Sequence, residues 1–311
     1  MIGITLTGGE QESASARLLR EADETFRSRK YADALEAYRR ASEAASGEKN
    51  LPAQVEALAQ VARCCSIQGK LDEGRPWLEM AEKLASASEP QGWSRLLGVQ
   101  GIFQREAGDK AAAKRTFEEM HRYCVEKGLF KRAIDAIHHL AIVVPIEEQP
   151  AWALKGIDAA ERLKDDASLA VLWNNLGLTY EDLKQYDKMV PAYLKARDYH
   201  HATGGPLQKM IADWAVGHGY RLAGDLAKAE EWLRKTLPLA EAGYAKDRRP
   251  ETAEWVGWCK KDLGETLLAR GDKARAPDLL RQARASLVEA GIDKSWPEGL
   301  KSLDEALEKV R

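Results

Sequence analysis

The sequence has few cysteines, few phenylalanines and no long apolar run. Its 311 residues include four Cys and four Phe, and the longest apolar stretch, residues 140–146, contains Pro145. A membrane-spanning helix needs about 20 apolar residues in a row, so we expect no insertion into a membrane. Residues 1–16 lack the basic start and the apolar run of about 7–15 residues that mark a secretory signal. A cytoplasmic protein is therefore predicted.

The cysteines are poorly placed for disulfides or for metal binding. Cys64 and Cys65 are adjacent, whereas Cys124 and Cys259 stand alone. Adjacent cysteines are a poor disulfide pair, and no C-x-x-C motif supplies half of a zinc site. We expect reduced thiols, as in a reducing compartment, and neither a metal nor another cofactor.

Signs of catalysis and of nucleic-acid binding are also missing. There is no phosphate-binding G-x-x-x-x-G-K-[ST] loop and no G-x-S-x-G elbow. His138 and His139 are adjacent, as are His200 and His201, so on a helix each pair diverges by about 100° and does not easily chelate one metal. Because 47 Lys and Arg face 49 Asp and Glu, no excess of positive charge neutralises phosphates. We expect neither an enzyme nor a nucleic-acid binder.

The sequence is rich in alanine, with 48 residues, and in charged residues, which make up 31%. This composition is typical of closely packed helices with large solvated faces. It does not suggest one thick core of large aliphatic and aromatic side chains.

The clearest local pattern begins at Trp173. Leu176, Gly177 and Tyr180 follow it at the spacing W-x2-L-G-x2-Y, and a second stretch with Tyr and Ala at regular positions extends to residue 196. This stretch resembles the tetratricopeptide repeat, a helix–turn–helix unit. Met189 stands where the family pattern has alanine.

Three turns support the repeat on physical grounds. Residues 107–113, 223–229 and 270–276 read AGDKAAA, AGDLAKA and RGDKARA. The Gly in each can take the left-handed conformation that ends a helix. The Asp that follows can accept hydrogen bonds from the free N–H groups of the next helix. Because one helix pair cannot bury its apolar face alone, neighbouring pairs must stack.

Equivalent positions recur about every 40 residues along the chain, compared with about 34 in the family pattern. In the fourth unit Pro145 and Pro150 replace the usual turn. We predict an all-α fold, a right-handed superhelical solenoid of about seven helix–turn–helix pairs plus a C-terminal capping helix. The predicted segments are a flexible N-terminus at 1–12, a solenoid at 13–290 with units at about 13–48, 51–88, 92–127, 130–165, 168–203, 206–243 and 251–290, and the capping helix at 293–311.

The resemblance implies that the first helices of the units line a concave groove, which binds a peptide segment or a partner protein. Carried over by position, the groove residues are Arg63, Arg95, His138, Asn174, Trp214, His218, Arg221, Trp258 and Lys261, with Glu265 in the last unit and Arg20, Asp23 and Arg27 in the first. Arg pairs with carboxylates, amides bind peptide backbone and Trp supplies anchor area. Such a mixture suits an extended or helical peptide.

Alternatives remain at several positions. Trp214 and Trp258 fit the groove and the core equally well, and the convex face is an alternative binding surface. Trp255 and Trp258, three residues apart, can present one aromatic face. Asn174 is reminiscent of the clamp that holds a terminal carboxylate in some relatives, but its basic partners do not line up.

The main functional prediction is a non-catalytic adaptor or scaffold for protein–protein interaction. The alternative is a regulatory repeat protein that senses a ligand or peptide and acts in trans. Self-association is compatible with both.

Overall fold

The structure is a computed structural model that describes residues 12–309. Over this range the chain forms helices and turns and no strand, which confirms the all-α prediction. It divides into two compact units that meet between Pro145 and Ile146, in the segment where the sequence lacks the usual repeat turn. The right-handed superhelical path and the predicted unit bounds stay predictions.

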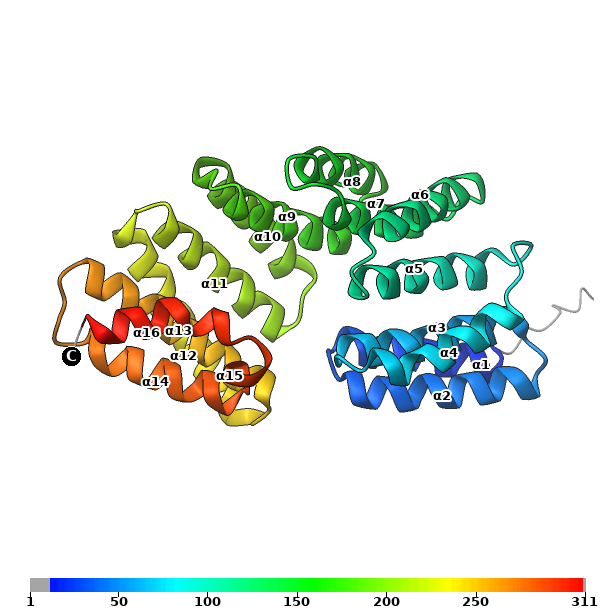
Figure 1. Ribbon diagram of the computed structural model, residues 1–311, viewed down its shortest axis with the longest axis horizontal. Helices are drawn as coiled ribbons and strands as arrows, with labels where there is room; N and C mark the ends of the chain where they lie inside the picture. The colour runs from blue at the N-terminus through cyan, green and yellow to red at the C-terminus, as the bar shows by residue number, and fades with distance from the viewer. Residues whose placement is uncertain (1–11, 310–311) are drawn as a thin grey trace, which may run out of the picture. The chain divides into compact units, whose positions relative to one another are not determined.

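The first unit consists of helix pairs that follow one another along the chain (Figure 1). Its helices are α1 (Ala14–Arg27), α2 (Tyr31–Gly47), α3 (Leu51–Ile67), α4 (Leu71–Leu84), α5 (Pro90–Glu106), α6 (Lys110–Glu126) and α7 (Phe130–Val143). Helices adjacent in sequence pack on one another, and α3 also packs on α5. This stacking of first helices is what the repeat predicts.

The second unit is built in the same way and ends in a short irregular segment. Its helices are α8 (Gln149–Leu163), α9 (Asp166–Asp182), α10 (Tyr186–Thr203), α11 (Pro206–Leu222), α12 (Leu226–Lys246), α13 (Pro250–Ala269), α14 (Ala276–Glu289), α15 (Ile292–Ser295), the 3-10 helix η1 (Pro297–Leu300) and α16 (Lys301–Glu308). The first helices α11 and α13 contact each other, and α16 packs on α13 and α14 (Figure 1).

Two of the three Gly-Asp turns have the geometry that the sequence predicts. Gly108 and Gly224 have positive φ angles of 85° and 83°, which L-residues with a side chain rarely adopt. Asp109 accepts a hydrogen bond from the backbone N–H of Ala112 at 2.8 Å. Asp225 does the same for Lys228 at 3.1 Å. In these two turns the prediction of Gly at the helix end and Asp at the next N-cap is confirmed. In the third turn Gly271 has a positive φ of 83° as predicted, but the N-cap of α14 is Arg275, so the prediction of Asp272 at the N-cap is wrong.

Alanine and glycine let the helices approach closely, while a few large side chains fill the gaps. A Cβ atom at Gly177 of α9 would overlap the ring of Tyr193 on α10. The absence of a side chain at Gly177 therefore lets the Tyr193 ring pack directly on the backbone of α9. Tyr193 and, in the first unit, Tyr38 are among the largest fully buried side chains. The buried alanines of the sequence therefore mark helix contacts, as expected.

The C-terminal segment caps the last helix pair but is not one continuous helix. Leu300 and Leu303 are buried against Leu280 and Leu287 of α14, whereas Trp296 lies in a break between α15 and η1 and is 57% exposed. Pro297 follows the break, which accords with the helix ending before proline. Of the predicted terminal segments, residues 1–11 and 310–311 lie outside the described residues.

The thiols behave as predicted from their spacing. All four cysteines are buried, and none is in a disulfide. Burial raises the pKa of the Cys64 thiol to about 12. Within residues 12–309, no helix is long and apolar enough to span a membrane.

Candidate functional site

A cavity of about 660 Å³ opens on the first helices of the second unit. Helix periodicity explains its walls, because residues three or four apart share one face. Thus α9 contributes Asn174, Leu178 and Glu181. The other lining residues are Tyr193 of α10, Ile211, Trp214, Ala215 and His218 of α11, Glu254, Trp255, Trp258, Lys261 and Asp262 of α13, and Trp296, Glu298, Gly299, Lys301, Ser302 and Glu305 of the C-terminal segment.

Four tryptophans give the cavity an aromatic wall. Trp214 and Trp255 meet edge to face with ring centroids 5.1 Å apart. Trp258 and Trp296 lie 5.9 Å apart at a tilt of 54°. The Trp296 ring packs over Gly299, where an added Cβ would come within 2.5 Å of the ring. This contact with its own turn holds Trp296 at the rim although the side chain is exposed.

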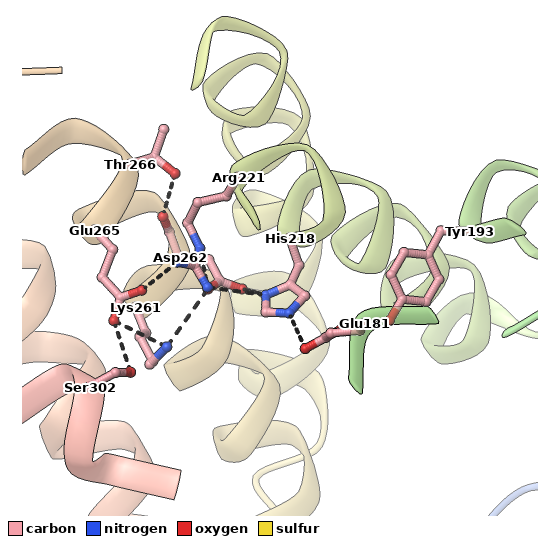
Figure 2. Close-up of polar contacts among 9 residues, drawn as sticks. All are labelled: Glu181, Tyr193, His218, Arg221, Lys261, Asp262, Glu265, Thr266 and Ser302. Atoms are coloured by element: carbon pink, nitrogen blue, oxygen red, sulfur yellow. Dashed lines mark hydrogen bonds and ion pairs between the residues drawn. The ribbon is translucent and has the colours of Figure 1, made fainter. Parts of the chain in front are cut away.

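Six charged side chains of alternating sign contact one another (Figure 2). They adjoin the aromatic wall, since the His218 ring stacks on Trp214 and the Lys261 ammonium lies near the Trp258 ring. We call the following set the charge network: Glu181, His218, Asp262, Arg221, Glu265 and Lys261. His218 bridges two carboxylates, with Nδ1 2.9 Å from Asp262 Oδ2 and Nε2 3.1 Å from Glu181 Oε1. Arg221 Nε lies 3.0 Å from Asp262 Oδ1, and its Nη1 lies 2.9 Å from Glu265 Oε2. Lys261 Nζ lies 3.1 Å from Glu265 Oε1.

Neutral groups complete the network. The Tyr193 hydroxyl donates to Glu181 Oε2 at 2.8 Å, and the Ser302 hydroxyl donates to Glu265 Oε1 at 3.2 Å. The network thereby connects α9, α10, α11, α13 and α16 (Figure 2). Buried charges are tolerated when each has an opposite charge and hydrogen-bond partners.

The network holds His218 in its charged form. Burial lowers the pKa of His218, but the carboxylates of Asp262 and Glu181 outweigh this effect and raise it to about 9. Burial also raises the pKa of Asp262, and the nearby His218 and Arg221 overcome it and hold that pKa far below its usual range. At neutral pH the network therefore contains three cations and three anions and has no net charge.

The first unit has a separate charged cluster around Glu56. This carboxylate contacts both Arg95, at 3.2 Å, and Arg132. Burial raises the pKa of Glu56, but the two guanidinium groups outweigh it and lower that pKa overall. Arg63 lies over the ring of Phe26, with its Cζ atom 5.1 Å from the centroid.

The adjacent histidines of α7 serve packing. His139 stacks on Phe117 with ring centroids 4.7 Å apart, and its ring lies 5.1 Å from that of His138. Burial lowers the pKa of His139 to about 3, although Asp135 lies 3.8 Å away. Among the described residues no group of His, Cys, Asp and Glu is arranged to hold a metal ion.

The predicted groove residues fall into two sets. Asn174, Trp214, His218, Trp258 and Lys261 line the cavity of the second unit. Arg221 joins the same site through the charge network. The other three, Arg63, Arg95 and His138, lie on α3, α5 and α7 of the first unit. The binding role of all nine stays a prediction.

Sequence reasoning missed several lining residues. Glu181 follows Asn174 by seven residues and Asp262 follows Trp258 by four, so helix periodicity places them on faces already assigned to the groove. That signal was available. No such signal existed for Trp296, because it lies at the cavity only as a result of how the C-terminal segment folds. None existed for Leu178 either, because its position in the sequence is that of an ordinary apolar helix residue.

Comparisons with known proteins agree with this architecture. The family model described as tetratricopeptide repeat matches residues 168–242, which include most of α9, all of α10 and α11, and most of α12. No curated protein matches the chain.

Several solved structures are similar in fold. A signal transduction ATPase with a tetratricopeptide repeat sensor, from Pyrococcus horikoshii, is 13% identical with a TM-score of 0.65, and the match covers 96% of this chain and 44% of that one. A Rap protein complexed with competence and sporulation factor is 11% identical, with 91% and 79% covered and a TM-score of 0.59. Aspartyl phosphate phosphatase F from Bacillus subtilis is 12% identical, with 98% and 96% covered and a TM-score of 0.56.

At such low identity these structures show the fold alone. The repeat model, the stacked helix pairs and the Gly-Asp turns nevertheless agree with one another. The chain contains tetratricopeptide repeats over residues 168–242 and has the fold of stacked helix pairs found in proteins with such repeats.

Proposed function

We propose that the protein is a non-catalytic interaction module that binds a peptide segment of a partner in the cavity of the second unit. The observation that carries this proposal is the wall of four tryptophans around one cavity of about 660 Å³. Tryptophan is among the residues that contribute most to binding at protein interfaces, above all in pockets that exclude water. An adaptor or scaffold role in the cytoplasm is the finer form of the proposal.

Exposed apolar side chains at the cavity support this function. Leu178 is 47% exposed and Trp296 is 57% exposed, and both line the cavity. Large apolar side chains gathered on one exposed surface are typical of sites that bind a partner. The similar Rap protein, whose structure contains competence and sporulation factor, is in line with ligand binding by such a fold.

A small-molecule sensor is the second candidate. The cavity volume lies within the range of about 300–1,000 Å³ found for small-molecule sites. The similar ATPase from Pyrococcus horikoshii carries its repeats as a sensor. On this alternative, the ligand would fill the cavity, and the regulated protein would bind elsewhere on the chain.

A peptide selection with matched variants tests the main proposal. A display library of random heptapeptides is selected on the full-length protein, and dissociation constants of the enriched peptides are measured by titration calorimetry. Trp296→Ala removes an exposed cavity residue, and Trp152→Ala removes a tryptophan of α8 that does not line the cavity. Leu178→Asn and Leu239→Asn form a second pair, 47% and 53% exposed, of which only Leu178 lines the cavity.

We expect the two cavity variants to weaken peptide binding about tenfold or more, since truncation of such anchors costs above about 1–2 kcal/mol. The two controls should bind as wild type. Trp214 and Arg221 are left intact, because one packs into the core and the other belongs to the charge network. Equal binding by all four variants would place the peptide site elsewhere. A thermal shift produced by small molecules, with no enriched peptide, would favour the sensor.

A further inference from the structure

The cations at the cavity are already neutralised by the protein itself. His218 contacts two carboxylates, and Lys261 Nζ lies 3.1 Å from Glu265 and 3.9 Å from Asp262. A ligand carboxylate that approached either cation would have to compete with these carboxylates. The charge network therefore offers no free positive site to an acidic ligand.

The charges that remain at the cavity are mostly negative. Outside the network, the lining contains three carboxylates, Glu254, Glu298 and Glu305, and one ammonium group, Lys301. Glu298, Lys301 and Glu305 are exposed, and no ion pair with another described residue is found for any of them. Three negative charges against one positive charge leave the cavity with an excess of two negative charges.

The aromatic wall suits a cation as well. The Trp258 indole N–H donates to Glu254 Oε1 at 3.0 Å, so a carboxylate is fixed beside an indole ring at the cavity surface. A cation held over a Trp face gains about 0.5–2 kcal/mol, more when water is excluded. In this protein the Lys261 ammonium already lies 5.9 Å from the centroid of the Trp258 ring.

We propose that the cavity accepts a Lys or Arg side chain of the bound peptide, held between the aromatic wall and the carboxylates Glu254, Glu298 and Glu305. This inference rests on the proposed peptide-binding function. The long aliphatic part of either side chain packs on indole rings while its charged end meets the rim carboxylates. An acidic side chain meets like charges there, and a neutral one leaves them unpaired.

Charge exchange on both partners tests the inference. The heptapeptides selected as described above are resynthesised with each basic residue replaced by norleucine, which keeps the aliphatic chain, or by Glu. They are titrated against wild-type protein, the double variant Glu298→Gln/Glu305→Gln and the control Glu308→Gln. Glu308 is an exposed carboxylate of α16, the helix of Glu305, and does not line the cavity.

We expect the enriched peptides to contain Lys or Arg and to lose at least about fivefold in affinity with norleucine, and more with Glu. The double variant should bind the basic peptide about three- to tenfold more weakly and the norleucine peptide as wild type does. The two changes should therefore be non-additive, as groups in contact are. Glu308→Gln should bind as wild type, and added salt should weaken only the basic peptide.

The outcomes separate this inference from the proposed function. Peptides that need Trp296 but bind equally well with norleucine overturn the cation site and leave peptide binding intact. Tighter binding of the Glu-substituted peptides overturns it as well. If no peptide depends on Trp296, the proposed function fails first and the cation site with it. A thermal melt of the double variant checks that the exposed substitutions leave the fold unchanged.

Discussion

The charge network makes the stability of the second unit depend on pH in a predictable direction. His218 has an ordinary pKa of 6.5 when unfolded and about 9 in the folded protein. A raised pKa in the folded state means that the folded protein binds the proton more tightly than the unfolded chain does. The stabilisation is therefore complete below pH 6.5 and is lost as the pH rises through about 9.

The size of the effect follows from the same two pKa values. Each pKa unit corresponds to about 1.4 kcal/mol, so the proton on His218 contributes about 3–4 kcal/mol that disappears between pH 6.5 and pH 9. The His218 side chain is only 14% exposed, so solvent screens the interaction weakly. For a unit of this size the loss lowers the melting temperature by about 7–14 °C.

Urea unfolding followed by Trp fluorescence measures this loss, because seven of the nine tryptophans lie after residue 145. His218→Gln should be less stable at pH 6.5 and should lose the dependence between pH 6.5 and pH 9. The control His201→Gln removes a more exposed histidine, 35% exposed, that contacts a single aspartate, and should keep it. A wild-type stability that is flat over this range would refute the reasoning. NMR titration of the His218 ring gives its pKa directly, even if the variant fails to fold.

Three further predictions concern packing and the first unit. Gly177→Ala should destabilise the protein by about 1–3 kcal/mol in urea unfolding, because the new methyl group overlaps the Tyr193 ring. The control Gly243→Ala, with nothing near its Cβ position, should be neutral or stabilising by up to about 1 kcal/mol. Glu56→Gln should cost about 3 kcal/mol, since two arginines lose their shared carboxylate; an unchanged midpoint would contradict this. Burial lowers the pKa of His139 to about 3, so the unfolded chain binds a proton more tightly than the folded protein does. The first unit should therefore lose stability as the pH falls below 6.5, and hydrogen exchange should show reduced protection of its backbone amides.

The sequence predicts the local structure well because the repeat is a local rule. Trp173, Gly177 and Tyr180 are four and three residues apart, which is the spacing of one helix face. The Gly-Asp turns determine where one helix ends and the next begins. Each of these signals acts within a few residues, so no knowledge of distant contacts is needed. The division between Pro145 and Ile146 is different, because it depends on which helices share contacts. Pro145 and Pro150 showed that the repeat is irregular at this point, but not that the chain divides into two units there.

The cavity was only partly predictable for the same reason. The family resemblance assigned Trp214, His218 and Trp258 to one groove, and they line one cavity. The contribution of Trp296 depends on how the chain turns after α14, where a four-residue helix, a break and a 3-10 turn replace the expected single helix. No periodic pattern describes such a segment. Trp214 is partly buried against a core cluster and also lines the cavity, so core and groove do not exclude each other at this position, and its binding role stays a prediction.

The expected charge of the ligand depends on the ion pairs within the protein more than on the number of charged residues in the groove. The predicted groove contains Arg, Lys and His, and a count of these cations favours a ligand with carboxylates. In the structure Arg221, Lys261 and His218 each contact carboxylates of the protein. Their positive charges are therefore neutralised within the network. Outside the network, the charged groups that line the cavity are the carboxylates of Glu254, Glu298 and Glu305 and the ammonium group of Lys301. Counted alone, the groove cations thus predict an acidic ligand. Once the ion pairs are taken into account, the same residues favour a basic ligand.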